Sequence, residues 1–228
     1  MIPWKVLDAA KVPGGKEMLT LKQRGTEFVI ALGDNQLMSN RLSATEQALA
    51  TMACDSMRAA KAPKILIGGL GMGFTLRAAL KILSPGAHIA VAELVPEVVK
   101  WARGPMAEIF AGSLDDPRTK IHVKDVGELI RAARLEYDAI LLDVDNGPEG
   151  LSRVANDALY DDKGLRAAHA ALKPGGVLAI WSSAPHEEFA ARLRKTRFTV
   201  KEIAVRAKGP RGGAQHLIWT ATRAKRSA

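Results

Sequence analysis

Residues 64–73 read KILIGGLGMG, and this stretch decides the fold. After the first lysine the strand pattern is continuously apolar, as expected when both faces of a parallel sheet are covered. The glycines that follow allow a tight turn and let the backbone pass close to a ligand. The helical pattern FTLRAALKIL comes next, at residues 74–83. A strand, a glycine-rich turn and a helix predict the opening unit of a Rossmann-like, doubly wound α/β sheet.

The alternation of strand and helix patterns continues toward the C-terminus. The last two strand patterns, at 198–205 and 216–222, are joined by about ten residues, which is too short for a crossover, so we expect an antiparallel hairpin. The predicted fold is therefore a mostly parallel α/β sheet with an antiparallel C-terminal hairpin, the layout of class I AdoMet-dependent transferases. The other strands are expected at HIAVAEL (88–94), KIHVKD (120–125), YDAILLDV (137–144) and VLAIWSS (177–183).

The segment before this alternation has strand patterns of its own. EMLTLK and EFVIAL, at 17–22 and 27–32, are joined by a turn at Gly25, and QLMSN at 36–40 predicts a third short strand. A helix is expected from Ser43 to the residues before Pro63. The predicted domains are a small N-terminal β appendage, residues 1–42, and an AdoMet-binding Rossmann-like domain, residues 43–228.

Composition narrows the class of protein. The 228 residues carry a net charge of +9, contain no apolar run of membrane-spanning length, and begin without the apolar core of a secretory signal. The single cysteine, Cys54, lies in an apolar helical pattern and is expected to be a buried residue in a cytoplasmic protein. Basic residues concentrate near the C-terminus, but no aromatic residues interleave with them, so a nucleic-acid partner is disfavoured.

Acidic residues stand at the ends of consecutive predicted strands. Glu93, Asp125 and Asp143 end the second, third and fourth strands, and the carboxyl ends of parallel strands form one crevice. The glycines fall as G-G-x-G-x-G rather than G-x-G-x-x-G, which favours a nucleoside-type cofactor over a dinucleotide. For Asp125, a role as helix N-cap is the stronger alternative. The predicted cofactor-binding residues are Gly68, Gly69, Gly71, Gly73, Glu93, Leu94, Asp125, Val126 and Asp143.

The stretch from Lys64 to Ser183 resembles the spermidine synthases, the polyamine aminopropyltransferases. KILIGGLGMGFTLRAAL is similar to their glycine loop, VAELVPEVVKWAR to the segment with their ribose-binding Glu, and YDAILLDV…GPEGL to the segment with their catalytic acid. The resemblance implies ribose binding by Glu93, adenine contact near Asp125, and catalysis by Asp143 with Asp145 as the second choice. It also implies association of two chains through the N-terminal β piece, where an open sheet edge invites pairing.

Three positions depart from the family pattern. The family's glycine loop carries an Asp where this chain has Gly71, and its D-S-x-D-P segment is replaced by DVDNGP at 143–148. The family's Tyr-His pair corresponds to Glu46-Gln47, although Glu46 also fits a capping box begun by Ser43, which is the favoured interpretation. An Asp at position 71 would repel the carboxylate of intact AdoMet, so Gly71 favours the intact cofactor.

These observations lead to three hypotheses. The favoured one is methyl transfer from AdoMet to a small-molecule acceptor; the alternative is aminopropyl transfer from decarboxylated AdoMet to an amine; the last is a non-catalytic binding module with the same fold. Asp143 and Asp145 are the candidates for orienting or deprotonating the acceptor, and Asp143 is also a candidate for holding the cofactor's amino group. No metal site is expected. The candidate substrate-binding residues are Glu46, Trp181 and Ser182.

Overall fold

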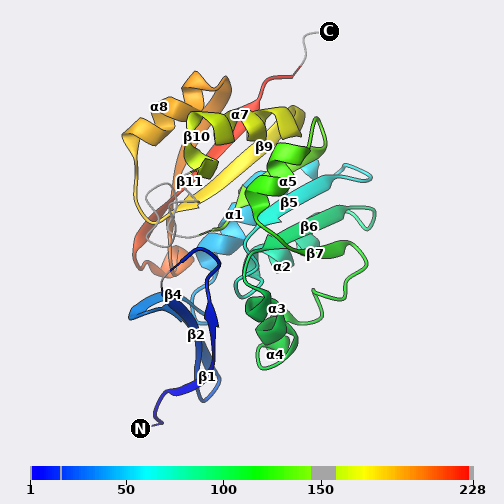
Figure 1. Ribbon diagram of the computed structural model, residues 1–228. Helices are drawn as coiled ribbons and strands as arrows, with labels where there is room; N and C mark the ends of the chain where they lie inside the picture. Colours follow the sequence, from blue (N-terminus) through cyan, green and yellow to red (C-terminus); the bar gives the residue numbers. More distant parts are fainter. Residues whose placement is uncertain (1, 16, 145–157, 226–228) are drawn as a thin grey trace.

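The computed structural model describes residues 2–15, 17–144 and 158–225, and the centre of this described part is a seven-stranded sheet (Figure 1). The strands lie in the order β10-β11-β9-β8-β5-β6-β7. Strands β5 to β9 pair in parallel, whereas β10 and β11 are antiparallel. The predicted sheet and its C-terminal hairpin are thereby confirmed. The strands are β5 (Lys64–Gly68), β6 (His88–Glu93), β7 (Thr119–Val123), β8 (Tyr137–Leu142), β9 (Leu172–Ser182), β10 (Phe198–Arg206) and β11 (Gln215–Arg223).

Strand β5 is the point at which the order of the parallel strands reverses. It pairs with β6 on one side and with β8 on the other. The chain therefore leaves β5 in one direction along the sheet and later returns to its opposite side. In open α/β sheets such a switch point creates a crevice at the carboxyl ends of the strands, where ligands bind.

Helices cover both faces of this sheet, and each face has its own core. The side chains of Ile65 and Ile67 belong to one core and that of Leu66 to the other, because successive residues of a strand point to opposite faces. Helices α1 (Ala44–Cys54) and α2 (Phe74–Ile82) pack together on the first face. The remaining helices are α3 (Pro96–Arg103), α4 (Ala107–Phe110), α5 (Val126–Ala132), α7 (Asp162–Ala171) and α8 (Glu187–Lys195), with short 3-10 turns η1 (Asp55–Met57) and η2 (Gly209–Arg211).

Helix α1 is shorter than the sequence pattern predicts. It ends at Cys54 and passes into the 3-10 turn η1 instead of continuing toward Pro63. Cys54 is buried, as its apolar surroundings indicate, and this burial raises the pKa of the thiol to about 12. A thiol in this environment is a packing group rather than a nucleophile.

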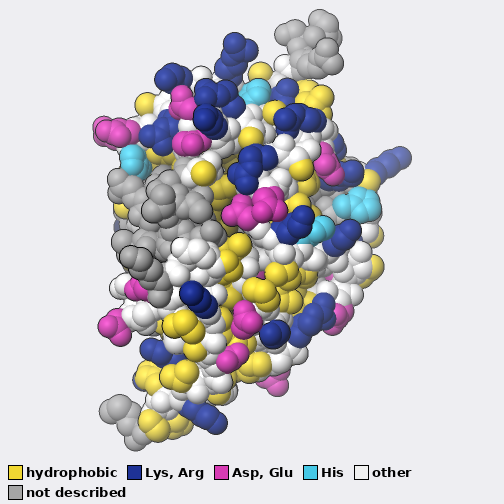
Figure 2. Space-filling view, viewed as in Figure 1, with side chains coloured by type: hydrophobic (Ala, Val, Ile, Leu, Met, Phe, Trp, Pro, Cys, Tyr) yellow, Lys and Arg dark blue, Asp and Glu magenta, His cyan; other side chains and the backbone are white. Residues whose placement is uncertain are grey.

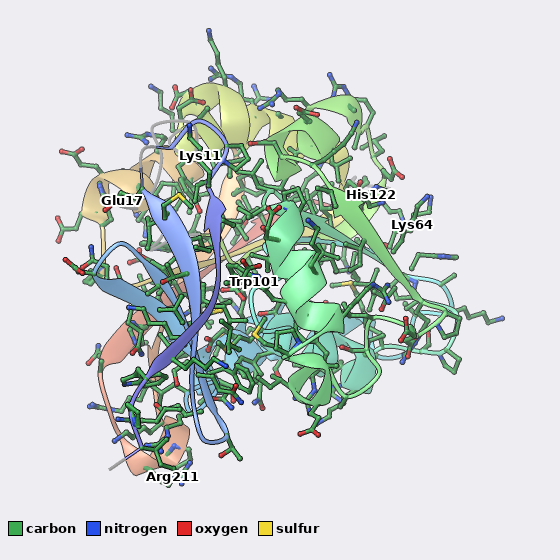
Figure 3. The ribbon with its side chains drawn as sticks, turned by 60° about the horizontal axis from the view of Figure 1, so that its bottom comes forward. Lys11, Glu17, Lys64, Trp101, His122 and Arg211 are labelled. Atoms are coloured by element: carbon green, nitrogen blue, oxygen red, sulfur yellow. The ribbon has the colours of Figure 1, made fainter. Side chains whose placement is uncertain are left out.

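The N-terminal segment forms a separate antiparallel sheet of β1 (Lys5–Lys11), β2 (Met18–Arg24), β3 (Glu27–Leu32) and β4 (Asn35–Ser39). Strand β1 is absent from the sequence prediction. Its Asp8 carboxylate accepts a hydrogen bond of 2.7 Å from Nε1 of Trp101, and Figure 3 shows Trp101 between α3 and β1. This contact ties the small sheet to the large one, and their buried side chains share one core. A domain boundary at residue 42 stays a prediction.

Charged and apolar side chains gather on different parts of the face shown in Figure 2. In the face shown in Figure 2, Lys and Arg side chains spread over the upper part, where α7 and α8 lie. Apolar side chains gather lower down, between the N-terminal sheet and the main sheet. Within the described ranges, the helices are too short or too polar for any of them to span a membrane.

Candidate functional site

Glycines form the floor of a cavity at the carboxyl end of β5. Gly69 has φ +89°, and a Cβ there would lie 2.4 Å from the carbonyl oxygen of Asp143. Gly71 has φ +50°, and its Cβ would lie 2.7 Å from Cε of Met38. Both positions line the cavity. Because neither tolerates a side chain without movement of its neighbours, the loop exposes bare backbone to any ligand.

The other two predicted glycines have packing roles. A Cβ at Gly68 would meet the Val126 side chain at 3.0 Å, and one at Gly73 would meet the ring of Phe110 at 2.4 Å. Gly73 has φ +75° and stands at the start of α2. Neither glycine lines the cavity. The structure therefore brings half of the predicted glycine set to the site and uses the rest to seat a helix against its neighbours.

Glu93 lies at the end of β6 and is 8% exposed. Its Oε2 accepts a hydrogen bond from the backbone N–H of Leu70 at 2.9 Å, and its Oε1 accepts one from Val95 at 2.8 Å. Burial raises the pKa of this carboxyl, while the backbone donors oppose the rise. Glu93 thus fastens the glycine loop and still has acceptor capacity on each oxygen for ribose hydroxyls. Leu94, the next residue, also lines the cavity.

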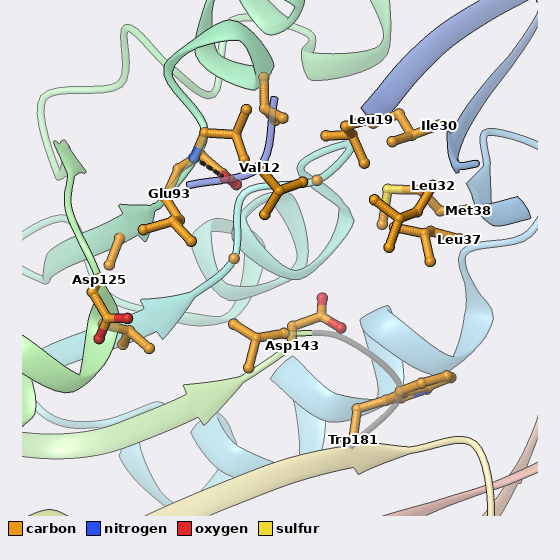
Figure 4. A pocket seen from close by; sticks show the side chains of 18 of the residues that line it. Val12, Leu19, Ile30, Leu32, Leu37, Met38, Glu93, Asp125, Asp143 and Trp181 are labelled. Atoms are coloured by element: carbon orange, nitrogen blue, oxygen red, sulfur yellow. Dashed lines mark hydrogen bonds between the residues drawn. The ribbon is translucent and has the colours of Figure 1, made fainter. Parts of the chain in front are cut away.

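Asp125 marks the far side of the same end of the cavity. Its Oδ1 accepts a 2.7 Å hydrogen bond from the N–H of Gly127, so it caps α5 as the alternative interpretation held. The cap does not remove Asp125 from the cavity, because Asp125 and Val126 both line it. Lys124 lines it too and was missed, although it directly precedes Asp125. Figure 4 shows Glu93 and Asp125 together on one side of the cavity.

Asp143, at the end of β8, is the acid in the middle of the cavity in Figure 4. Its Oδ2 accepts a hydrogen bond of 2.6 Å from the Thr75 hydroxyl. Burial and then the negative charge of Glu46 raise the pKa of Asp143 to about 7, with the Thr75 hydrogen bond acting in the opposite direction. A carboxyl whose pKa lies near neutrality is suited to accept or share a proton.

Glu46 is a cavity residue and does not close a capping box. Ser43, at the start of α1, makes no side-chain capping bond, and its Oγ instead accepts a bond from the Gln47 amide at 2.8 Å. The Glu46 carboxylate accepts a 2.7 Å bond from the Thr45 hydroxyl and lines the cavity. The favoured sequence interpretation of Glu46 is therefore wrong, because the backbone at Ser43 does not adopt the geometry that such a box requires.

Of the two predicted substrate-binding residues at the end of β9, Trp181 and Ser182, the structure brings only Trp181 to the cavity. Trp181 lines the cavity, and its ring lies 5.0 Å from that of His216. Ser182 is buried, does not line the cavity, and donates a 2.8 Å hydrogen bond to the carbonyl oxygen of Ala184. Neighbours on a strand point to opposite faces, so only one of these two can reach the site. Asp145 lies outside the described residues.

The N-terminal sheet supplies an apolar wall that the sequence did not reveal. Five side chains of this sheet, and that of Val12 just after β1, face the cavity of about 210 Å³, and most of them stand on the side opposite Glu93 and Asp125 in Figure 4. Near Asp143 and Trp181 the cavity is thus bounded by aliphatic groups. The wall consists of Val12, Leu19, Ile30, Leu32, Leu37 and Met38.

Together the switch point, the bare glycine loop and the buried glutamate define a class, an α/β protein whose cavity suits a nucleoside-type ligand and also holds carboxylates. A family model described as "Spermine/spermidine synthase domain" matches residues 44–205. The chain belongs to this family, which confirms the resemblance.

Curated relatives are named polyamine aminopropyltransferases. A polyamine aminopropyltransferase 1 of Streptomyces coelicolor is 33% identical over 125 residues, or 53% of this chain. A polyamine aminopropyltransferase of Sulfolobus acidocaldarius is 30% identical over 121 residues, also 53% of this chain. The match spans 22% of the Streptomyces protein and 39% of the Sulfolobus protein. The common region is therefore a minor part of both relatives.

Solved structures agree on the fold. The crystal structure of spermidine synthase from Thermotoga maritima has a TM-score of 0.73 and 20% sequence identity to this chain. The likeness covers 96% of this chain and 73% of that one. A spermidine synthase in complex with the transition-state analogue AdoDATO gives the same TM-score, covering 72% of its chain.

The prediction of methyl transfer is wrong. The family and its relatives are spermine/spermidine synthases and polyamine aminopropyltransferases. The prediction took Gly71 as space left for the carboxylate of intact AdoMet. The Met38 side chain occupies that space, so packing accounts for the glycine and the inference about the cofactor does not follow.

Proposed function

We propose that this chain transfers an aminopropyl group from decarboxylated AdoMet to an amine. The donor supplies a sulfonium: as the acceptor nitrogen bonds to the propyl carbon, the carbon–sulfur bond breaks and its electron pair stays on sulfur, giving 5′-methylthioadenosine. The attacking nitrogen must also lose a proton. The enzyme's part is to align the two substrates, exclude water and accept that proton.

The observation that carries this proposal is one cavity in which Gly69, Glu93 and Asp143 meet in a chain of this family. Gly69 offers backbone without a side chain, and Glu93 offers acceptor oxygens to ribose hydroxyls. Asp125 and Lys124 bound the space for adenine. Asp143 is proposed to orient the acceptor nitrogen and take its proton. Asp145 remains a second candidate for this role.

The test is turnover by the purified chain with decarboxylated AdoMet and putrescine or a longer diamine. We expect 5′-methylthioadenosine and the aminopropylated amine in equal amounts, identified by mass spectrometry. Reactions without acceptor, or with intact AdoMet as donor, are the controls and should give neither product. Absence of both products with every diamine tried would overturn the proposal.

We also propose a homodimer formed through the N-terminal sheet. Strand β1 is an edge of that sheet, and unpaired edges invite pairing. Nearby, Val6 is 56% exposed and Ile2 64% exposed. Light scattering at micromolar concentration should give twice the chain mass, and Val6→Lys should give the single mass. A wild-type monomer would refute this assembly. A cytoplasmic location stays a prediction from the single cysteine.

A further inference from the structure

Glu46 lines the cavity, and its carboxylate takes no part in capping helix α1. It closes no capping box, since the Ser43 side chain accepts no backbone N–H from the first turn of α1. Its carboxylate accepts a hydrogen bond from the neighbouring Thr45 hydroxyl at 2.7 Å. Helix α1 thus carries an acid into a cavity walled largely by aliphatic groups, where an unpaired charge is costly.

Asp143 faces the same cavity, and the two acids repel each other. The negative charge of Glu46 is, after burial, the main cause of the raised pKa of Asp143. Among the residues that the structure describes, neither acid forms an ion pair with a lysine, arginine or histidine. Lys124, the basic residue lining the cavity, stands beside Asp125 and lies 4.0 Å from Glu128. Within the described ranges, this end of the cavity therefore holds two carboxylates without a paired cation.

The glycine loop contributes no side chain at this end. Cε of Met38 lies 2.7 Å from the place where a Cβ on Gly71 would stand, so β4 fills the space that a residue here would need. Leu37 and Met38 instead present aliphatic surface. A ligand that satisfies both features has an ammonium group for the acids and a methylene stem for the wall.

We propose that Glu46 determines substrate binding by holding one primary ammonium group whose methylene stem lies against Leu37 and Met38, while Asp143 takes the proton of the attacking nitrogen. The inference rests on the proposed function and adds a residue to it. Two sources offer this chemistry: the aminopropyl arm of the donor and the far end of a diamine acceptor. Charge-assisted hydrogen bonds to a carboxylate are about twice as strong as neutral ones, so loss of the charge should be measurable.

The donor arm of the test compares decarboxylated AdoMet with 5′-methylthioadenosine, which has the same nucleoside but no ammonium. Calorimetry on the whole chain gives both affinities for wild type and for Glu46→Gln. If the donor's ammonium is bound, E46Q weakens decarboxylated AdoMet by about tenfold or more and leaves methylthioadenosine within about twofold. Asp55→Asn is the matched control, since it removes one exposed carboxylate just after α1, and both affinities should stay at wild-type values.

The acceptor arm measures turnover against diamine concentration. If the acceptor's far ammonium is bound, E46Q leaves both donor affinities unchanged and raises the KM for the diamine by about tenfold or more. Glu46→Asp, which keeps the charge, should restore part of the lost affinity in either arm. A purely structural role for Glu46 would weaken methylthioadenosine as well.

Two results overturn the inference. One is an E46Q chain that matches wild type in both arms; the other is equal weakening of both nucleosides together with a lower melting temperature. Failure of the proposed function looks different, because wild type itself would then give no methylthioadenosine from donor and diamine. Wild-type turnover with an unaffected E46Q variant would leave the proposed function standing and remove only the role of Glu46.

Discussion

The carboxylates at the two ends of the cavity differ in their hydrogen-bond partners and in the charges near them. At one end, Glu93 is buried and each of its oxygens accepts a backbone N–H, from Leu70 and from Val95. At the other, Asp143 accepts one hydroxyl, from Thr75, and faces the negative charge of Glu46. At the first end both carboxylate oxygens have backbone partners, whereas at the second neither acid pairs with a lysine, arginine or histidine that the structure describes. The difference indicates which part of a ligand each end receives.

A carboxylate satisfied by the backbone can serve the fold and a ligand together, because its oxygens keep further acceptor sites. An unsatisfied pair serves the fold poorly, since burial and mutual repulsion both penalise ionisation. Such a pair is retained where a ligand supplies the missing charge. The comparison therefore predicts that changes at the Glu93 end damage stability and nucleoside binding, and that changes at the Asp143 end damage turnover while improving stability.

The largest expected effect is on turnover by Asp143→Asn. Loss of the group that accepts the proton should lower the rate of methylthioadenosine formation by about 10² to 10⁴, the usual contribution of a general base. Binding of methylthioadenosine should change little, because Glu93 and the glycine loop at the other end of the cavity are unchanged. Initial rates and calorimetry on the same preparation separate the two quantities. Turnover within tenfold of wild type would exclude Asp143 as the proton acceptor.

The next effect in size concerns Glu93→Ala. The substitution leaves the buried N–H groups of Leu70 and Val95 without their acceptor, at about 1–3 kcal/mol of unfolding free energy for each. Methylthioadenosine should also bind more weakly. Urea denaturation measures the first effect, with Glu128→Ala as a control that removes an exposed glutamate and should cost under about 0.5 kcal/mol. If the two variants have the same free energy of unfolding, Glu93 does not stabilise the glycine loop.

A smaller effect, a gain in stability, is expected for Asp143→Asn at high pH. In the folded chain the pKa of Asp143 is raised from 3.8 to about 7, so the folded state keeps a proton that the unfolded chain releases. Stability therefore falls as pH rises between these two values. Asp143→Asn cannot ionise and escapes this loss. Its melting temperature should exceed that of wild type at pH 8 by several degrees, at about 2–4 °C per kcal/mol.

At about pH 3 the same comparison should give nearly equal melting temperatures, because wild-type Asp143 is then mostly protonated in both the folded and the unfolded state. Thermal unfolding of both proteins at a series of pH values provides the test. A melting-temperature difference that stays constant across the series would mean that the substitution acts through packing and not through the charge.

Part of this molecule was predictable from sequence for a simple reason. The β5 strand and its glycines lie next to each other in the chain, and Glu93 ends the strand that follows, so local pattern places them in one crevice. Strand β1 gave no such signal: among its residues KVLDAAK only Ala10 is buried, and the register shifts between Val6 and Asp8. Without alternation of buried and exposed residues, a strand cannot be recognised by period.

The end of the cavity that holds Glu46 and Asp143 was unpredictable because it depends on tertiary packing. The apolar wall comes from the N-terminal segment, and nothing near Leu37 or Met38 in sequence indicates that they line this cavity or that Met38 packs at Gly71. Glu46 was assigned to a capping box because its spacing from Ser43 matches that pattern, yet the cap does not form. Spacing shows which bonds are geometrically available, whereas the backbone angles at Ser43 decide whether they are made.

The smallest expected effect tests that last point. If Glu46 is free of capping, Ser43→Ala should change the unfolding free energy by no more than about 0.5 kcal/mol. The matched comparison is Asp161→Ala, since the Asp161 carboxylate accepts bonds of 2.7 Å from the N–H groups of Lys163 and Gly164 at the start of α7, and loss of such a cap costs about 0.5–2 kcal/mol. If Ser43→Ala lowers the unfolding free energy as much as Asp161→Ala does, the capping box forms and includes Glu46. The role of Glu46 in binding an ammonium group would then be weakened, because its carboxylate would already be bonded to the backbone.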